Sequence, residues 1–124
     1  GSEQLAIISS SLEKLMKEKK LFLQPDLTIS QLAEEVNCSR HHLSQVLNDQ
    51  LDQSYYDYIN CLRVEEAKYL LTQPKFQQYK IASVAYDAGF NSLSTFNEVF
   101  KKQTGKTPSD YRKESLKEYR QQRV

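Results

Sequence analysis

The sequence predicts an all-α protein in which one helix-turn-helix unit is folded twice. The 124 residues include only three Gly and three Pro, so few turns are available and strands are not expected. The segment from Ile29 to Tyr58 recurs from Ile81 to Tyr111 with one residue inserted at the turn, and a register kept through two helices indicates a repeat. We therefore expect seven helices, which form two helix-turn-helix units joined by a long linker helix.

The repeat is carried by apolar, capping and turn residues at matching positions. The matched pairs are Ile29 and Ile81, Leu32 and Val84, Ala33 and Ala85, Val36 and Ala88, Asn37 and Gly89, Ser39 and Ser92, Leu43 and Phe96, Val46 and Val99, Leu47 and Phe100, Asp52 and Gly105, and Tyr58 and Tyr111.

An N-terminal segment, residues 1–20, is expected to form the first helix from about residue 3. Its apolar residues return at the spacing of one helix face; they are Leu5, Ile8, Leu12, Leu15 and Met16. Two roles stay open for this helix, a dimerisation element or a cap on the first unit. Gly1-Ser2 resembles an expression-tag remnant, and a helical pattern that starts at once predicts a piece excised from a longer protein.

The first helix-turn-helix unit is expected over residues 21–54. Thr28 and Gln31 have the spacing of a capping box at the start of its first helix. Asn37 is expected to end that helix, because asparagine tolerates the left-handed conformation of a tight turn. Ser39 can cap the next helix, so the first recognition helix is predicted over residues 39–50.

A linker helix is expected over residues 55–73, and the second unit over residues 74–124. Roughly 18 residues of helix span about 27 Å, which suits recognition helices in major-groove segments about 34 Å apart. The second recognition helix is predicted over residues 92–103, and Pro108 is expected to begin a last helix. Aromatic residues at core periodicity are expected to be structural; they are Tyr55, Tyr56, Tyr58, Phe90, Phe96, Phe100 and Tyr111.

The composition argues against several classes of protein. A charged fraction of 27% and a hydrophobic fraction of 39% suit a soluble helical protein, and no apolar run approaches the roughly 20 residues of a membrane span. Cys38 and Cys61 lack zinc-site spacing, which indicates small buried residues in a reducing cytoplasm. Adjacent His41 and His42 lack a third metal ligand, and no nucleophile motif or phosphate loop indicates an enzyme. Neither a metal nor a cofactor is expected.

Charge is unevenly distributed along the chain. The net charge is only +1, but residues 101–124 carry eight basic and three acidic side chains, a net +5. One basic end can supply contacts to phosphates even when the whole chain is nearly neutral. The alternative is a solvated amphipathic tail.

These motifs together resemble the AraC/XylS family of bacterial transcription regulators. In the second unit the resemblance is carried by Ile81-Ala82, Gly89-Phe90, Phe96, Phe100-Lys101-Lys102, Gly105, Thr107-Pro108 and Tyr111-Arg112. In the first unit and linker it is carried by Leu32-Ala33, Ser39, Leu43-Ser44, Tyr58-Ile59-Asn60, Arg63 and Glu66-Ala67. The resemblance covers about residues 21–112. It implies a cytoplasmic bacterial domain that binds double-stranded promoter DNA, acts on RNA polymerase and follows a sensory region, with a homodimer and a membrane anchor elsewhere in the full-length protein left open.

Carried over by position, the resemblance implies DNA contacts on both recognition helices. The base-contact candidates are Arg40, His41, Ser44 and Gln45 in the first unit and Ser94, Thr95, Asn97 and Glu98 in the second. Phosphate contacts are expected from Ser39, Ser92, Lys101, Lys102, Lys106 and Arg112.

Glu98 departs from the family pattern, in which a basic or amide residue is commoner. A carboxylate either specifies cytosine or weakens the grip of the second unit, and we favour the weaker grip. The competing function is a helical protein-interaction module that docks on RNA polymerase or a partner subunit. The salt dependence of DNA affinity distinguishes the two functions, because binding driven by phosphate contacts weakens steeply as ionic strength rises.

Overall fold

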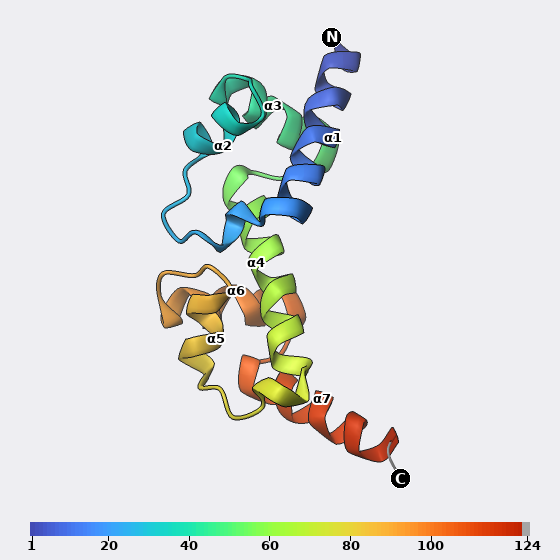
Figure 1. The fold of residues 1–124 in the computed structure, drawn as a ribbon, viewed down its shortest axis with the longest axis vertical. Coiled ribbons are helices and arrows are strands. Elements are labelled where there is room, and N and C mark those ends of the chain that lie inside the picture. Colours follow the sequence, from blue (N-terminus) through green and yellow to red (C-terminus); the bar gives the residue numbers. More distant parts are fainter. Residues whose placement is uncertain (123–124) are drawn as a thin grey trace. The chain divides into compact units, whose positions relative to one another are not determined.

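The computed structural model describes residues 1–122, and within them the chain forms seven α-helices, two short 3-10 helices and no strand (Figure 1). This confirms the predicted all-α fold. The chain divides into two compact units, residues 1–60 and residues 61–124. The boundary falls inside α4 (Tyr55–Thr72), the predicted linker helix. Among the described residues, no helix has the length and apolarity needed to cross a membrane.

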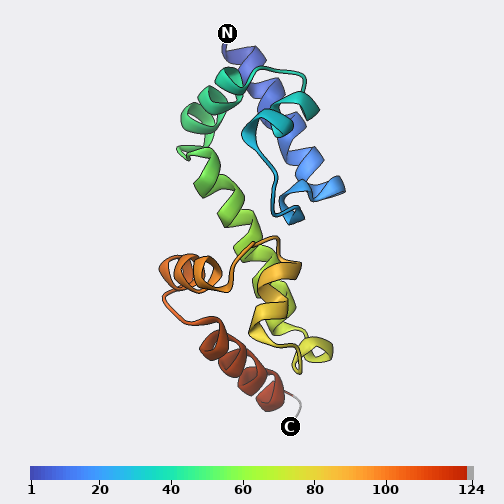
Figure 2. The ribbon, with the colours of Figure 1, turned by 90° about the vertical axis from the view of Figure 1, so that its left-hand side faces the viewer.

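The first unit contains α1 (Ser2–Lys19), a 3-10 helix η1 (Leu21–Leu23), α2 (Ile29–Glu35), α3 (Arg40–Leu51) and the first residues of α4. Within the first unit, helix α1 packs against α3 and lies beside it (Figure 1 and Figure 2). The buried side chains of these two helices are Ile8, Leu12, Met16, Leu43, Val46 and Leu47. Helix α1 is therefore part of the core of the first unit, as expected of a cap on that unit.

Local side-chain hydrogen bonds set where the helices of the first unit begin. The capping box is formed in both directions, since Thr28 Oγ1 accepts from the Gln31 N–H at 3.1 Å and Gln31 Oε1 accepts from the Thr28 N–H at 3.0 Å. Ser39 Oγ accepts from the His42 N–H at 3.0 Å and caps α3. Asn37, with φ of 56°, makes the turn between α2 and α3 in the left-handed conformation, as predicted.

The second unit contains the rest of α4, a 3-10 helix η2 (Pro74–Phe76), α5 (Ile81–Asp87), α6 (Leu93–Thr104) and α7 (Pro108–Gln122). Its turn residues Gly89 and Gly105 have positive φ values of 100° and 79°, where Asn37 and Asp52 stand in the first unit. Ser92 caps α6 by accepting from the Thr95 N–H at 3.1 Å. The same turn and cap geometry thus occurs in both units, which confirms the predicted register.

Aromatic side chains form the centre of the second core. Phe96 stands between Phe90 and Phe100, with ring centroids 5.1 and 5.5 Å away, and all three are buried. Tyr111 from α7 meets the Phe100 ring edge-on at a centroid distance of 5.3 Å. Tyr111 therefore holds α7 against the core of the second unit, as predicted.

Three details differ from the expectations. Tyr56 is 60% exposed and is not a core residue, because it lies on the outer face of α4. Its neighbour Tyr55 is half-buried, and its hydroxyl donates to the Leu27 carbonyl at 3.0 Å. Cys38 and Cys61 are half-buried free cysteines instead of fully buried ones.

Candidate nucleic-acid interface

Helix α3 has one buried apolar face and one exposed polar face. Leu43, Val46 and Leu47 are fully buried, and their spacing places the remaining side chains on the other side of the helix. Arg40, His41 and Gln45 are exposed and Ser44 is half-buried. All four predicted base-contact residues of the first unit are therefore accessible along one helix.

Helix α6 repeats this division. Phe96 and Phe100 are buried, whereas Ser94, Asn97 and Glu98 are exposed. The two recognition helices are each 12 residues long and each begins at a serine cap. In both units, a serine-capped helix of the same length thus buries an apolar face and exposes polar side chains on the opposite face.

Thr95 lies differently from the other candidates on α6. It is half-buried, and its hydroxyl accepts a hydrogen bond from Ser92 Oγ at 2.9 Å. Counted from the two capping serines, Thr95 corresponds to His42, and the residue that corresponds to Arg40 is Leu93. The alignment of the two capping serines therefore adds Leu93 to the positions of α6 that correspond to candidates on α3.

The phosphate candidates fall into three groups. Ser39 and Ser92 are the helix caps, which places both hydroxyls at the starts of recognition helices. Lys101 and Lys102 are exposed on the last turn of α6, and neither forms an ion pair with another residue of the described chain. Lys106 and Arg112 are already engaged within the protein.

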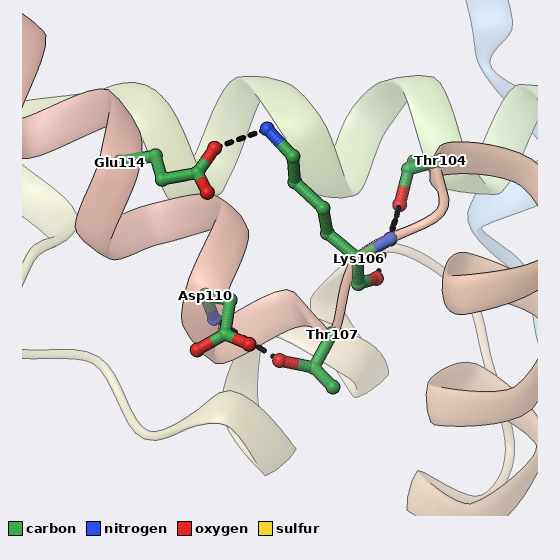
Figure 3. A network of polar contacts seen from close by, with 5 residues as sticks. All are labelled: Thr104, Lys106, Thr107, Asp110 and Glu114. Carbon is green, nitrogen blue, oxygen red and sulfur yellow. Dashed lines mark hydrogen bonds and ion pairs between the residues drawn. The ribbon is translucent and has the colours of Figure 1, made fainter.

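Lys106 lies in the connection between α6 and α7, where several polar side chains are bonded to one another (Figure 3). The Lys106 ammonium pairs with the Glu114 carboxylate, and this hydrogen bond together with the negative charge raises the pKa of Lys106. Thr107 Oγ1 accepts from the Asp110 N–H at 3.1 Å and caps α7. Arg112 donates to the Tyr79 carbonyl. The first two bonds span the turn between α6 and α7, and the third joins α7 to the segment before α5.

The two units differ in net charge. Residues 1–60 contain five Lys or Arg and nine Asp or Glu, a net −4, whereas residues 61–124 contain twelve basic and seven acidic side chains, a net +5. Arg123, one of the eight basic residues counted from Lys101 onward, lies outside the described residues. Attraction to a polyanion is therefore concentrated in the second unit.

The thiol of Cys38 and the imidazoles of His41 and His42 are the nucleophile and metal-ligand candidates of the first unit. Burial raises the pKa of the Cys38 thiol, which is the direction opposite to that of an activated thiolate. The His41 and His42 rings are tilted, with centroids 6.3 Å apart. Within residues 1–122, no group of three or more His, Cys, Asp or Glu side chains is placed to hold a metal ion.

A family model described as a helix-turn-helix domain, of the AraC type, matches residues 32–114. The chain belongs to the AraC/XylS family. The match begins in α2 and ends in α7, so it includes both recognition helices of this AraC-type domain.

Related proteins are regulators or parts of regulators. An uncharacterized HTH-type transcriptional regulator of Staphylococcus aureus (strain COL) is 34% identical over 93 residues, which are 75% of this chain and 12% of the relative. The C-terminal domain of AraT, a response regulator from Geobacillus stearothermophilus, is 29% identical with a TM-score of 0.70, over 86% of this chain and 84% of that one. The DNA-binding domain of AdpA, a global transcriptional factor solved in complex with a target DNA, shares the fold at 24% identity and a TM-score of 0.66, over 87% and 88% of the two chains. The AraC-type chain thus spans about an eighth of the length of the Staphylococcus relative.

Proposed function

We propose that this AraC-type domain binds double-stranded promoter DNA in a sequence-specific manner, with α3 and α6 entering successive major-groove segments. The observation that carries the proposal is the pair of serine-capped, 12-residue helices, each of which buries an apolar face and exposes a polar one. A helix of this diameter fits the major groove, where base edges differ in their donors and acceptors. Membership of the family and the AdpA complex with a target DNA support it.

The exposed side chains have the chemistry of base readout. Gln45 and Asn97 are amides that can pair with adenine through two hydrogen bonds, and Arg40 can do so with guanine or bind a phosphate. His41 fits either a base or a phosphate. Glu98 can accept from cytosine, but its negative charge on α6 opposes phosphate approach, so the second unit contributes less to base recognition than the first.

Phosphate contacts are assigned first to Lys101 and Lys102, whose ammonium groups are exposed at the end of α6. Lys106 and Arg112 rank below them, because the charge of Lys106 is partly offset by its ion pair with Glu114 and the Arg112 side chain is held at the Tyr79 carbonyl. The serine hydroxyls of Ser39 and Ser92 complete the set at the starts of the two helices.

The domain would act as the output part of a longer bacterial regulator, with RNA polymerase as a partner, in the cytoplasm. A second function is a protein-interaction module that docks on RNA polymerase or a partner subunit. The net charge of −4 on residues 1–60 favours it, since that unit repels a polyanion.

The deciding experiment is fluorescence anisotropy of the chain with a random pool of duplex DNA at several salt concentrations, followed by selection of the bound sequences. DNA binding predicts an affinity that falls linearly with the logarithm of salt concentration, and enrichment of a bipartite site with half-sites about one helical turn apart. Absent or salt-insensitive binding would move the conclusion to the protein-interaction module.

A further inference from the structure

Helix α6 begins with a leucine that does not join the core. Leu93 is 36% exposed, whereas Phe96 and Phe100 of the same helix are fully buried. Within the described residues, the core of the second unit and the partly buried side chains packed on it do not include Leu93. About a third of this apolar side chain therefore stays accessible at the start of α6.

The position of Leu93 is that of a base-reading residue. It directly follows the capping Ser92, as Arg40 directly follows Ser39. The N-terminal residues of a recognition helix are those that contact base edges. Nearby Thr95 is half-buried and its hydroxyl accepts a hydrogen bond from Ser92 Oγ, whereas Leu93 and Ser94 are the exposed side chains at this end of α6.

An isobutyl group has one complementary partner on the major-groove edge. The thymine 5-methyl group is apolar, whereas the other groups presented there are hydrogen-bond donors or acceptors. A leucine placed against those polar groups would remove water from them without replacing their hydrogen bonds, which is unfavourable.

We propose that Leu93 is a specificity-determining residue that reads the 5-methyl group of one thymine in the half-site bound by α6. This inference rests on the proposed function, because it requires α6 to enter the major groove. It adds Leu93 to the base-reading residues proposed for the second unit.

The test uses the selected DNA site with each thymine replaced in turn by deoxyuridine, which lacks only the methyl group. The unsubstituted protein is expected to lose about fourfold in affinity at one thymine, the factor for one buried methyl group. Leu93→Ala should bind thymine and uracil equally at that position and keep its discrimination elsewhere. Leu93→Met, which retains an apolar side chain, should keep most of the preference for thymine.

Gln103→Ala is the matched control, because it truncates another exposed side chain of α6 that is not among the base- or phosphate-contact candidates; its preference for thymine should be unchanged. Melting temperatures check folding. If the alanine variant is destabilised, Leu93→Gln carries the test, because it keeps the length of the side chain but ends in a polar amide and should also bind thymine and uracil equally. Equal affinity for thymine and uracil at every position, in a protein that still selects a DNA site, would overturn the role of Leu93 alone. Absence of sequence-selective binding would overturn the proposed function as well.

Discussion

Two serines at equivalent positions decide which side chains of the recognition helices are presented. Ser39 and Ser92 accept from the backbone N–H three residues ahead, and this bond fixes where each helix starts. Once the start is fixed, the helical period fixes which residues face the core and which face solvent. Gln45 and Glu98, six residues after each cap, are both exposed as a result.

Truncation of Gln45 and truncation of Lys102 should change DNA binding in different ways. Gln45→Ala is expected to relax the preference at one base pair at a cost of about 1–3 kcal/mol. Lys102→Ala should weaken binding to all sequences alike and lower the salt slope by about one, because a phosphate contact carries no sequence information. Anisotropy titrations of selected and scrambled duplexes measure both effects. Equal losses of both variants on every sequence would remove Gln45 from base readout.

Tyr58 should make the first unit sensitive to alkali. Burial, assisted by the negative charge of Glu13, raises the pKa of Tyr58 from 10.0 to about 12. The unfolded chain then loses this proton at lower pH than the folded one, so stability is retained below pH 10 and lost as the pH rises toward 12. In urea unfolding experiments, the free energy of unfolding of Tyr58→Phe should fall less between pH 10 and pH 12 than that of the unsubstituted protein. Tyr56→Phe is the control, because Tyr56 is 60% exposed and should leave the fall unchanged.

At the scale of the elements, both recognition helices begin at a serine cap, but the residues at which they end differ in type. Helix α3 ends at Asp52 with φ of 53°, and α6 ends at Gly105 with φ of 79°. Both residues adopt the left-handed conformation, which glycine reaches without strain and other residues reach at a cost.

Gly105→Ala should therefore destabilise the protein by about 1 kcal/mol through backbone strain alone. A Cβ atom at this glycine would meet nothing within 4 Å, so no steric clash contributes. Gly105→Asn is expected to cost less, because asparagine tolerates this conformation. Denaturant unfolding measures the free energy of unfolding of both variants. An equal loss of this free energy in the two variants would contradict the assignment to backbone strain.

Most helices could be predicted because their signals are local. Thr28 with Gln31, Ser39, Ser92 and Pro108 each mark a helix start within one turn of sequence. The 3-10 helices Leu21–Leu23 and Pro74–Phe76 were missed, since three residues are too few to show a period.

Other features depend on contacts that periodicity does not encode. The stripe of α1 predicts an apolar face but does not name α3 as its partner. The prediction that Tyr56 lies at core periodicity is wrong, because adjacent residues of a helix point in different directions and Tyr56, beside half-buried Tyr55, is 60% exposed. Thr95 stays a predicted base-contact residue, but the hydrogen bond from Ser92 to its hydroxyl could not be read from the sequence.

For the whole molecule, the unequal net charges of the two units predict which unit makes DNA binding sensitive to salt. Lys14 and Lys101 are both exposed and carry the same charge, but Lys14 belongs to the unit of net −4 and Lys101 to the unit of net +5. Lys101→Gln should lower the slope of log affinity against log salt by about one, whereas Lys14→Gln should leave it unchanged. Equal slopes for the two variants would mean that phosphate contacts are not concentrated in the second unit.

The two recognition helices share their caps and supports but not their exposed side chains. Arg40 stands where Leu93 stands in the other unit, and Gln45 where Glu98 stands. Two recognition helices with different exposed side chains would require a DNA site whose two half-sites differ in sequence and cannot be exchanged. A protein bound to such a site has a direction along the duplex, so one domain could distinguish the upstream from the downstream side of a promoter without a second copy.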